Sequence, residues 1–213
     1  MNKSLTLSTL FLVIGSALAQ SGDEINRPNF VVGDSWTYQQ TDLWKNDLKP
    51  GTKTIAVKKI KGDQIHFRGT LLDGNKWTYN ADLDMNVPYT FKGDKYTNIE
   101  YSWPLKAGMS WKNDRQFAAG EAEVTLEETC EVGPLTKVVV PAGEFDTYRI
   151  ACKGFFTNSL GGQGSHESLN WYAPVVKRYV KLEQRWWVGS RLSDQYKDEL
   201  TAFHLTQSIA VSQ

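Results

Sequence analysis

The sequence predicts a mainly β protein: a curved antiparallel sheet that forms an open barrel or sandwich, with few short helices. Two observations support this prediction. Apolar and polar residues alternate at a period of two along several stretches, and turns rich in glycine and aspartate separate those stretches. No stretch carries a sustained apolar stripe at helical spacing.

The first 19 residues predict a cleaved signal peptide. Lys3 supplies a positive charge, Leu5 to Ile14 form a short apolar core, and Ala17-Leu18-Ala19 is a small-residue cleavage signal. A membrane anchor is the alternative, but the apolar run is short for a bilayer, and no cysteine follows it to carry a lipid. We therefore expect residues 20–213 to form a single β domain, periplasmic or secreted by a bacterium, with no transmembrane segment.

Charge and composition narrow the range of partners. The chain has 24 basic and 24 acidic residues, so removing Lys3 with the signal peptide leaves 23 against 24. A nearly neutral chain without a basic block does not favour nucleic acid as a partner. Eight Trp, nine Tyr and nine Phe make the chain rich in aromatic residues, which suit both pleated sheets and binding clefts.

The segment from Ile65 to Leu83 predicts a β-hairpin with a loop at Asp73-Gly74-Asn75. Both strands place apolar residues on one face, and an aromatic ring would cover the strand glycine. A turn at Gly62-Asp63 joins this hairpin to a strand around Thr54–Ile60. The expected cross-strand pairs are Leu71 with Trp77, Gly69 with Tyr79, Phe67 with Ala81, and Ile65 with Leu83.

Further strands follow along the chain. Pro141-Ala142-Gly143 predicts a corner, since proline cannot donate to a ladder and glycine permits backbone angles that other residues avoid. The expected strands are Glu121–Val132, Phe145–Phe156, Glu167–Tyr172, Val175–Trp187 and Glu199–Leu205.

The only two cysteines, Cys130 and Cys152, fall on the inward faces of neighbouring strands. An exported chain with matching faces predicts a disulfide between them. A nucleophilic cysteine is the alternative, but no basic neighbour is evident that would activate one.

Three charged residues allow two interpretations each. Glu128 falls on the inner face of its strand. It is either a buried catalytic acid, or it lies at a β-bulge or near the sheet edge. Arg149 and Arg178 project from aromatic strands, either as ligand anchors or as surface charges on the outer face of a sheet.

No motif predicts known catalytic or metal chemistry. His66, His166 and His204 are far apart and lack the spacing of zinc ligands. Ser165-His166-Glu167 are adjacent, but neighbouring strand residues point to opposite faces. There is no G-x-S-x-G elbow, and the glycines of 160–165 lack a P-loop context. We expect no metal site and no cofactor. A pair of acids brought together in space for glycoside hydrolysis stays an open alternative.

Tryptophans on the predicted strands are the candidate binding residues. A curved sheet can enclose a cavity, and rings on its inner face either line that cavity or fill the core. The candidates are Trp36, Trp77, Trp111 and Trp171. A lipid, a lipidated protein or the flat face of a glycan would suit such a lining, and other envelope proteins are further candidate partners.

Five segments together resemble a broad family of exported bacterial all-β proteins of unknown function. They are GDSWTY (33–38), WPLKAGMSW (103–111), VPAGEFDTYRI (140–150), WYAPVVKRYVK (171–181) and DELTAFHL (198–205). In that family Gly-x-x-Trp, Pro-Leu-x-x-Gly-x-x-Trp, Val-Pro-Ala-Gly-x-Phe and Trp-Tyr-x-Pro motifs recur in this order. The resemblance covers most of the chain after the signal peptide, and it implies a fold and an exported location rather than a reaction.

The sequence thus predicts an exported, periplasmic binding or structural module of the cell envelope that holds an apolar or glycan ligand without catalysis. The alternative is a hydrolase that acts on wall or extracellular polymers.

Overall fold

A computed structural model describes residues 24–45 and 50–207. The predicted signal peptide lies outside the described residues. No helix within the described part of the chain has the length and apolar character needed to cross a membrane.

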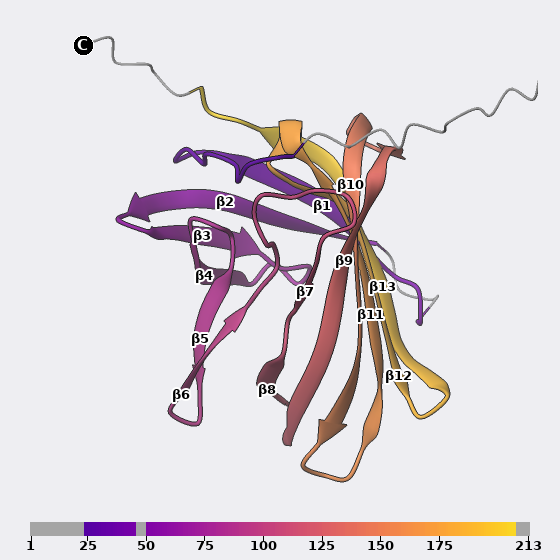
Figure 1. Ribbon diagram of the computed structural model, residues 1–213. Coiled ribbons are helices and arrows are strands. Elements are labelled where there is room, and N and C mark those ends of the chain that lie inside the picture. Colours follow the sequence, from indigo (N-terminus) through magenta and orange to yellow (C-terminus); the bar gives the residue numbers. More distant parts are fainter. Residues whose placement is uncertain (1–23, 46–49, 208–213) are drawn as a thin grey trace, which may run out of the picture.

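The predicted fold class is confirmed: one large, curved antiparallel sheet dominates the structure and does not close into a barrel (Figure 1). Its strand order is β4-β3-β2-β1-β13-β12-β11-β10-β9-β7, with β8 also paired to β9, and β5 pairs with β6 in a separate hairpin. The strands are β1 (Ser35–Asp42), β2 (Gly51–Lys61), β3 (Gln64–Thr70), β4 (Lys76–Asp82), β5 (Val87–Phe91), β6 (Asp94–Asn98), β7 (Ser110–Lys112), β8 (Arg115–Ala119), β9 (Ala122–Val140), β10 (Gly143–Asn158), β11 (Gln163–Ala173), β12 (Arg178–Val188) and β13 (Arg191–His204).

The sheet bends into two arms. Strands β2–β4 extend to the left in Figure 1, whereas β9–β13 run downward. Side chains of β1, which lies between the two arms in the strand order, bond across this bend: the Trp36 indole donates to the Val176 carbonyl at 2.8 Å, and the Tyr38 hydroxyl donates to the Tyr179 carbonyl at 2.9 Å. The core therefore lies on the inner, concave face of the sheet.

Strand β9 shows how the sequence builds this face. From Val124 to Val132 its even-numbered residues are buried and its odd-numbered ones are exposed. Cys130 on β9 lies directly across from Cys152 on β10, and the structure contains the predicted disulfide between them. The predicted Pro141-Ala142 corner joins the two strands, and Gly143 after it has a φ of 135° that favours glycine.

The predicted β3–β4 pairing is wrong by two residues. Gly69 pairs with Trp77, Phe67 with Tyr79, and Ile65 with Ala81. Leu71 and Leu72 belong to the loop, which a hydrogen bond from the Leu71 N–H to the Asn75 carbonyl closes. A shift of two residues keeps every side chain on its predicted face, so the strand glycine is still covered by a ring, but the ring is Trp77.

The predicted strand Val175–Trp187 begins too early. Pro174–Val176 form a short 3₁₀ helix, and Lys177 after it has a φ of 65°. Proline is well suited to the first position of a helix, and the left-handed residue redirects the chain, so β12 begins at Arg178.

The disulfide gives a first testable prediction. Cys130 and Cys152 are 22 positions apart, so the bond closes a loop whose constraint on the unfolded chain is worth roughly 3 kcal/mol. We expect the double variant Cys130→Ala/Cys152→Ala to lose about that much free energy of unfolding in urea. A reductant should lower the stability of the original chain similarly and leave the variant unchanged. An equal effect of reductant on both proteins would contradict the prediction.

Candidate functional site

A cavity of about 350 Å³ lies on the concave face of the sheet. Side chains from both arms line it, from β2 and β4 on one side and from β8 to β12 on the other, and the β5–β6 hairpin closes a third side. A larger hollow, of about 560 Å³, is more open and is lined mainly by outward-facing side chains such as Lys153 and Phe155. The enclosed cavity is therefore the candidate site.

Arg178 lines the cavity and is 4% exposed. Its guanidinium carbon lies 5.3–5.6 Å from the ring centres of Trp36, Phe67 and Tyr179. One nitrogen, Nη1, donates a hydrogen bond to the Tyr79 hydroxyl at 3.1 Å. No carboxylate among the described residues forms an ion pair with it. The three aromatic rings thus stabilise the buried guanidinium in place of a counter-ion. A cation–π contact at a desolvated site is worth about 2 kcal/mol.

Lys53, by contrast, has its counter-ion within the protein. Its ammonium group pairs with Asp198, which is fully buried. The same carboxylate accepts hydrogen bonds from the Gln40 amide at 2.8 Å and the Tyr179 hydroxyl at 3.2 Å. Lys53 is consequently held at the cavity wall in one position.

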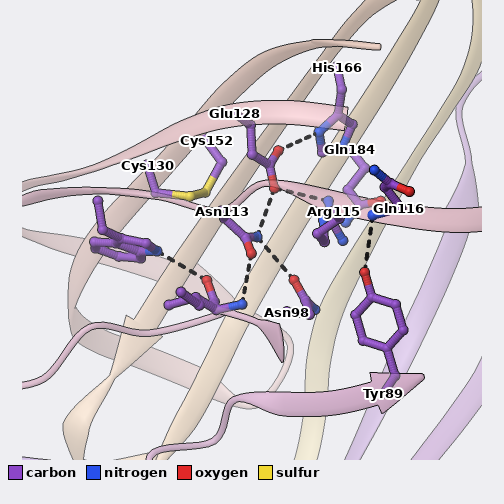
Figure 2. Close-up of polar contacts among 12 residues, drawn as sticks. Tyr89, Asn98, Asn113, Arg115, Gln116, Glu128, Cys130, Cys152, His166 and Gln184 are labelled. Carbon is purple, nitrogen blue, oxygen red and sulfur yellow. Dashed lines mark hydrogen bonds and ion pairs between the residues drawn. A yellow bond between two sulfur atoms is a disulfide. The ribbon is translucent and has the colours of Figure 1, made fainter. Parts of the chain in front are cut away.

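Glu128 is the centre of a second polar group in the wall (Figure 2). Its Oε1 accepts hydrogen bonds from Asn113 Nδ2 and Arg115 Nη2, both at 2.9 Å, and its Oε2 lies 2.8 Å from His166 Nδ1. Burial alone would raise the pKa of the Glu128 carboxyl, but the His166 hydrogen bond and the Arg115 charge outweigh burial and lower it. With Nδ1 donating to Glu128, the other His166 nitrogen, Nε2, is left without a partner.

A glycine makes the Glu128–His166 contact possible. Glu128 and His166 pair with the same residue, Gly154, from the two strands on either side of β10. A Cβ on Gly154 would lie 2.5 Å from the Glu128 Cβ and would also clash with the Glu127 carbonyl. The two side chains therefore meet across a whole strand because the residue between them has no side chain.

Glu128 is buried in the regular alternation of β9, with no bulge at its position. The predicted β-bulge at Glu128 is thus wrong. The predicted position near the sheet edge holds in part, since only the short strands β7 and β8 lie beyond β9. Arg178 projects inward and Arg149 is exposed on the opposite face of the sheet.

Glu100, in the loop after β6, is the second carboxylate of the cavity wall. It makes no hydrogen bond or ion pair with any described residue. Burial raises the pKa of its carboxyl, and the charges of Arg178, Arg115 and Lys53 oppose that rise without cancelling it. Three cations thus surround this carboxylate without touching it.

Unpaired polar atoms are concentrated around this cavity. Among the described residues, five buried side-chain nitrogen or oxygen atoms have no hydrogen-bond partner, and all five belong to residues that line it. They are Trp77 Nε1, Arg115 Nε, His166 Nε2, Asn170 Oδ1 and Arg178 Nε. A buried polar atom without a partner costs about 1–3 kcal/mol, so their gathering at one place calls for an explanation.

The four candidate tryptophans occupy different environments. Trp77 lines the cavity, stacked on Tyr79 at 4.9 Å between ring centres. Trp36 is buried in the core beneath Arg178, and Trp111 donates its indole N–H to the Ile99 carbonyl beside the disulfide. Trp171 alternates with the buried Tyr172 and therefore lies on the outer face, under the Lys181 ammonium. The structure brings only Trp77 of the four to the cavity wall, and ligand binding by them stays a prediction.

Sequence reasoning missed Lys53, Glu100, Asn113 and Arg115 as residues of one site. Glu100 and Asn113 lie between strands and belong to no pattern that singles them out. The strand glycine Gly154 was the available signal, because an isolated glycine in a strand often marks a close approach of neighbouring groups.

Comparison with solved structures finds likeness in fold. A protein from Parabacteroides distasonis, provisionally described as a lipoprotein, matches with a TM-score of 0.55 and 12% identity over 85% of this chain and 100% of its own. A Bacteroides fragilis protein, provisionally described as exported and as having a YmcC-like fold, matches at 0.47 and 12% identity over 85% and 100%. The hypothetical lipoprotein YmcC from Escherichia coli matches at 0.40 and 11% identity over 79% and 84%.

At such low identity the first likeness shows a shared fold alone, and the other two are too weak to support an inference. No family model matches the sequence, and no curated protein matches it significantly. The first neighbour is consistent with the all-β fold that the motifs predict, and membership of the family that they resemble stays a prediction.

Gly154 provides a second testable prediction. In Gly154→Ala the new methyl group must displace Glu128 and the neighbouring backbone, so we expect a loss of about 1–3 kcal/mol in the free energy of unfolding. Gly133→Ala is the matched control on β9, since its Cβ would meet its nearest atom at 3.3 Å. Urea denaturation should show a clearly smaller loss for the control, and equal losses would contradict the role given to Gly154.

Glu128 leads to a prediction about pH. Its folded-state pKa is lowered, so its contribution to stability is complete above its usual pKa of 4.5 and is lost as the pH falls through the folded value. The stability difference between the original chain and Glu128→Gln should therefore shrink on acidification from pH 6 to pH 3. Chemical denaturation at a series of pH values measures it, and a constant difference would show that the carboxylate charge is not what His166 and Arg115 stabilise.

Proposed function

We propose that this chain is an exported, non-catalytic binding module of the bacterial cell envelope that holds a hydroxyl-rich ligand, a saccharide, in its concave cavity. The lining of that one cavity carries the proposal: amide and charged side chains stand beside aromatic rings, and five of the lining residues keep a polar side-chain atom without a partner within the described protein. A saccharide offers hydroxyls that both donate to and accept from such groups.

The wall combines two features that suit a sugar ring. Tyr79 and Trp77 of the wall stack at 4.9 Å between ring centres, and the buried Phe67 stacks on Tyr79 at 4.7 Å, with both ring pairs inclined by 10°. Around the stack stand amide groups, among them Asn98, Asn113, Asn170 and Gln184. A flat aromatic surface packs against the C–H face of a sugar, and amides both donate to and accept from its hydroxyls.

An apolar ligand fits the same wall less well. A lipid tail would remove Arg178, Glu100 and the amides from water without giving them hydrogen bonds, at a cost of roughly 1–3 kcal/mol for each polar group. Of the two ligand classes that the sequence suggests, the lining therefore favours the glycan.

The two carboxylates of the wall argue for binding rather than hydrolysis. A glycoside hydrolase needs one acid and one carboxylate that is free to act as a nucleophile or base. Both oxygens of Glu128 are already engaged by Asn113, Arg115 and His166. Glu100 alone is free of partners among the described residues.

Location rests on two supports. The leader of 1–19 has the pattern of a signal peptide, and the Cys130–Cys152 disulfide fits an extracytoplasmic compartment. We place the protein in the periplasm or outside the cell, where saccharides of the envelope are within reach.

Two tryptophans make a matched test. Native mass spectrometry of the protein purified from its own host should show a co-purifying saccharide, and titration of the emptied protein with envelope oligosaccharides should shift its tryptophan fluorescence. We expect Trp77→Ala, in the wall, to weaken binding about tenfold or more, since a lost stacking surface is worth at least about 1.4 kcal/mol. Trp171→Ala, on the outer face, should bind normally.

A bare protein mass, together with fluorescence that no oligosaccharide alters, would refute the proposal. Binding of phosphatidylglycerol vesicles in place of oligosaccharides would do the same, because it would assign the cavity to lipid.

A further inference from the structure

Not every charge of the cavity wall has a partner of opposite charge in direct contact with it. Three cations line it, Lys53, Arg115 and Arg178. Lys53 pairs with Asp198 and Arg115 pairs with Glu128, so two of the three are compensated by direct contact. Arg178 has aromatic rings and a hydroxyl around it but no carboxylate in contact. One guanidinium is thus left in a low-dielectric wall without a counter-ion beside it.

Glu100 carries the one carboxylate of this wall that no cation touches. It lies near enough to Arg178, Arg115 and Lys53 for all three charges to affect its ionisation. No ion pair forms between the carboxylate and these cations, and all four side chains line the same cavity. Whatever enters the cavity can therefore meet both Arg178 and Glu100.

We propose, building on the saccharide-binding function above, that the ligand carries an anionic oxygen group, a carboxylate or phosphate, that binds against Arg178, and that Glu100 takes up a proton from solvent as this group enters. The ligand class is then an acidic saccharide. Guanidinium matches the planar geometry of a carboxylate and the tetrahedral oxygens of a phosphate better than an ammonium does.

Proton uptake keeps the site electrically balanced. With Glu100 ionised, the wall and Asp198 together carry three positive and three negative charges. An entering anion makes this sum negative, and a proton on Glu100 restores it. Protonated Glu100 then donates a hydrogen bond to the ligand, where the ionised form would repel it.

The surroundings of Glu100 favour this protonation. Its pKa is already raised by burial in the free protein, and a bound anion raises it further. Affinity should therefore be highest at low pH and fall as the pH rises through the window above the usual 4.5. The titratable and charged groups around Glu100 are Lys53 on β2, Tyr79 on β4, Arg115 on β8, Glu128 on β9, His166 on β11, Arg178 and Tyr179 on β12, Tyr196 on β13, and the adjacent Tyr101.

The experiment compares an acidic probe with its neutral twin. The full mature chain is titrated with a disaccharide of a uronic acid and a hexose, and with the same disaccharide after reduction of its carboxyl group to an alcohol. A second pair, glucose 1-phosphate and glucose, distinguishes phosphate from carboxylate as the anion. The readout is the Trp77 indole N–H resonance, identified by its loss in Trp77→Ala, together with calorimetry in two buffers of different ionisation enthalpy.

We expect one acidic probe to bind about tenfold or more tightly than its neutral twin at pH 5 and to bind with uptake of a proton. Glu100→Gln should bind that probe about tenfold more tightly than the original chain at pH 8, without proton uptake and with little dependence on pH. Glu131→Gln is the control, because Glu131 is exposed on the outer face and changes the net charge equally. It should leave the affinity and its pH profile unchanged.

Three outcomes would overturn the inference. Equal affinity for acidic and neutral twins would refute the anionic ligand while leaving saccharide binding intact. Weaker binding of the acidic probe by Glu100→Gln would mean that the ionised carboxylate accepts a hydrogen bond from the ligand. If no saccharide of either pair binds at any pH, and envelope oligosaccharides also fail, the proposed function fails together with this inference.

Discussion

The buried guanidinium of Arg178 links the curvature of the sheet to the chemistry of its concave face. The rings of Trp36 and Phe67 approach it from β1 and β3, Tyr79 accepts its hydrogen bond from β4, and the residue itself begins β12. One side chain thus contacts strands from both arms. A desolvated cation cannot be left among apolar groups without compensation, so the arms must close around it with aromatic faces and hydroxyls. The same enclosure leaves a positive group in the lining of a cavity.

A sheet of this kind has to tolerate a polar hollow where other β-proteins have a packed core. The five polar side-chain atoms without a partner within the described protein all belong to residues that line this hollow. On the strands of the wall, the Cys130–Cys152 disulfide joins β9 to β10, and the Glu128 carboxylate joins β9 to His166 on β11. The polar wall is thus built on strands that are linked to each other by more than their backbone hydrogen bonds.

Local sequence patterns predicted the strands, the Pro141-Ala142-Gly143 corner and the disulfide because each depends on residues close in sequence. A period of two assigns Cys130 and Cys152 to the inner face, and because their strands are neighbours the two side chains meet. The β3–β4 register was missed because the loop contains Leu71 and Leu72, two apolar residues whose pattern continues that of the strand. The start of β12 was missed for a similar reason, since Val175 and Val176 have the composition of a strand but belong to the 3₁₀ helix before it. Local patterns thus located elements well and their ends less well.

The cavity is beyond the reach of such patterns because its wall is assembled from both ends of a bent sheet. Alternation separates Trp171 from Tyr172, yet it cannot say which of the two faces becomes concave when the sheet bends. Nor can it bring Lys53 near Glu100 or Arg178, which are distant in the chain. Gly154 shows what kind of signal does exist. A glycine inside a regular strand gives up a side chain that the sheet would otherwise pack, and such a loss persists where neighbours need the space. Here the neighbours are an acid and a histidine on the two flanking strands, and the missing side chain between them lets Glu128 and His166 meet in the wall of the cavity.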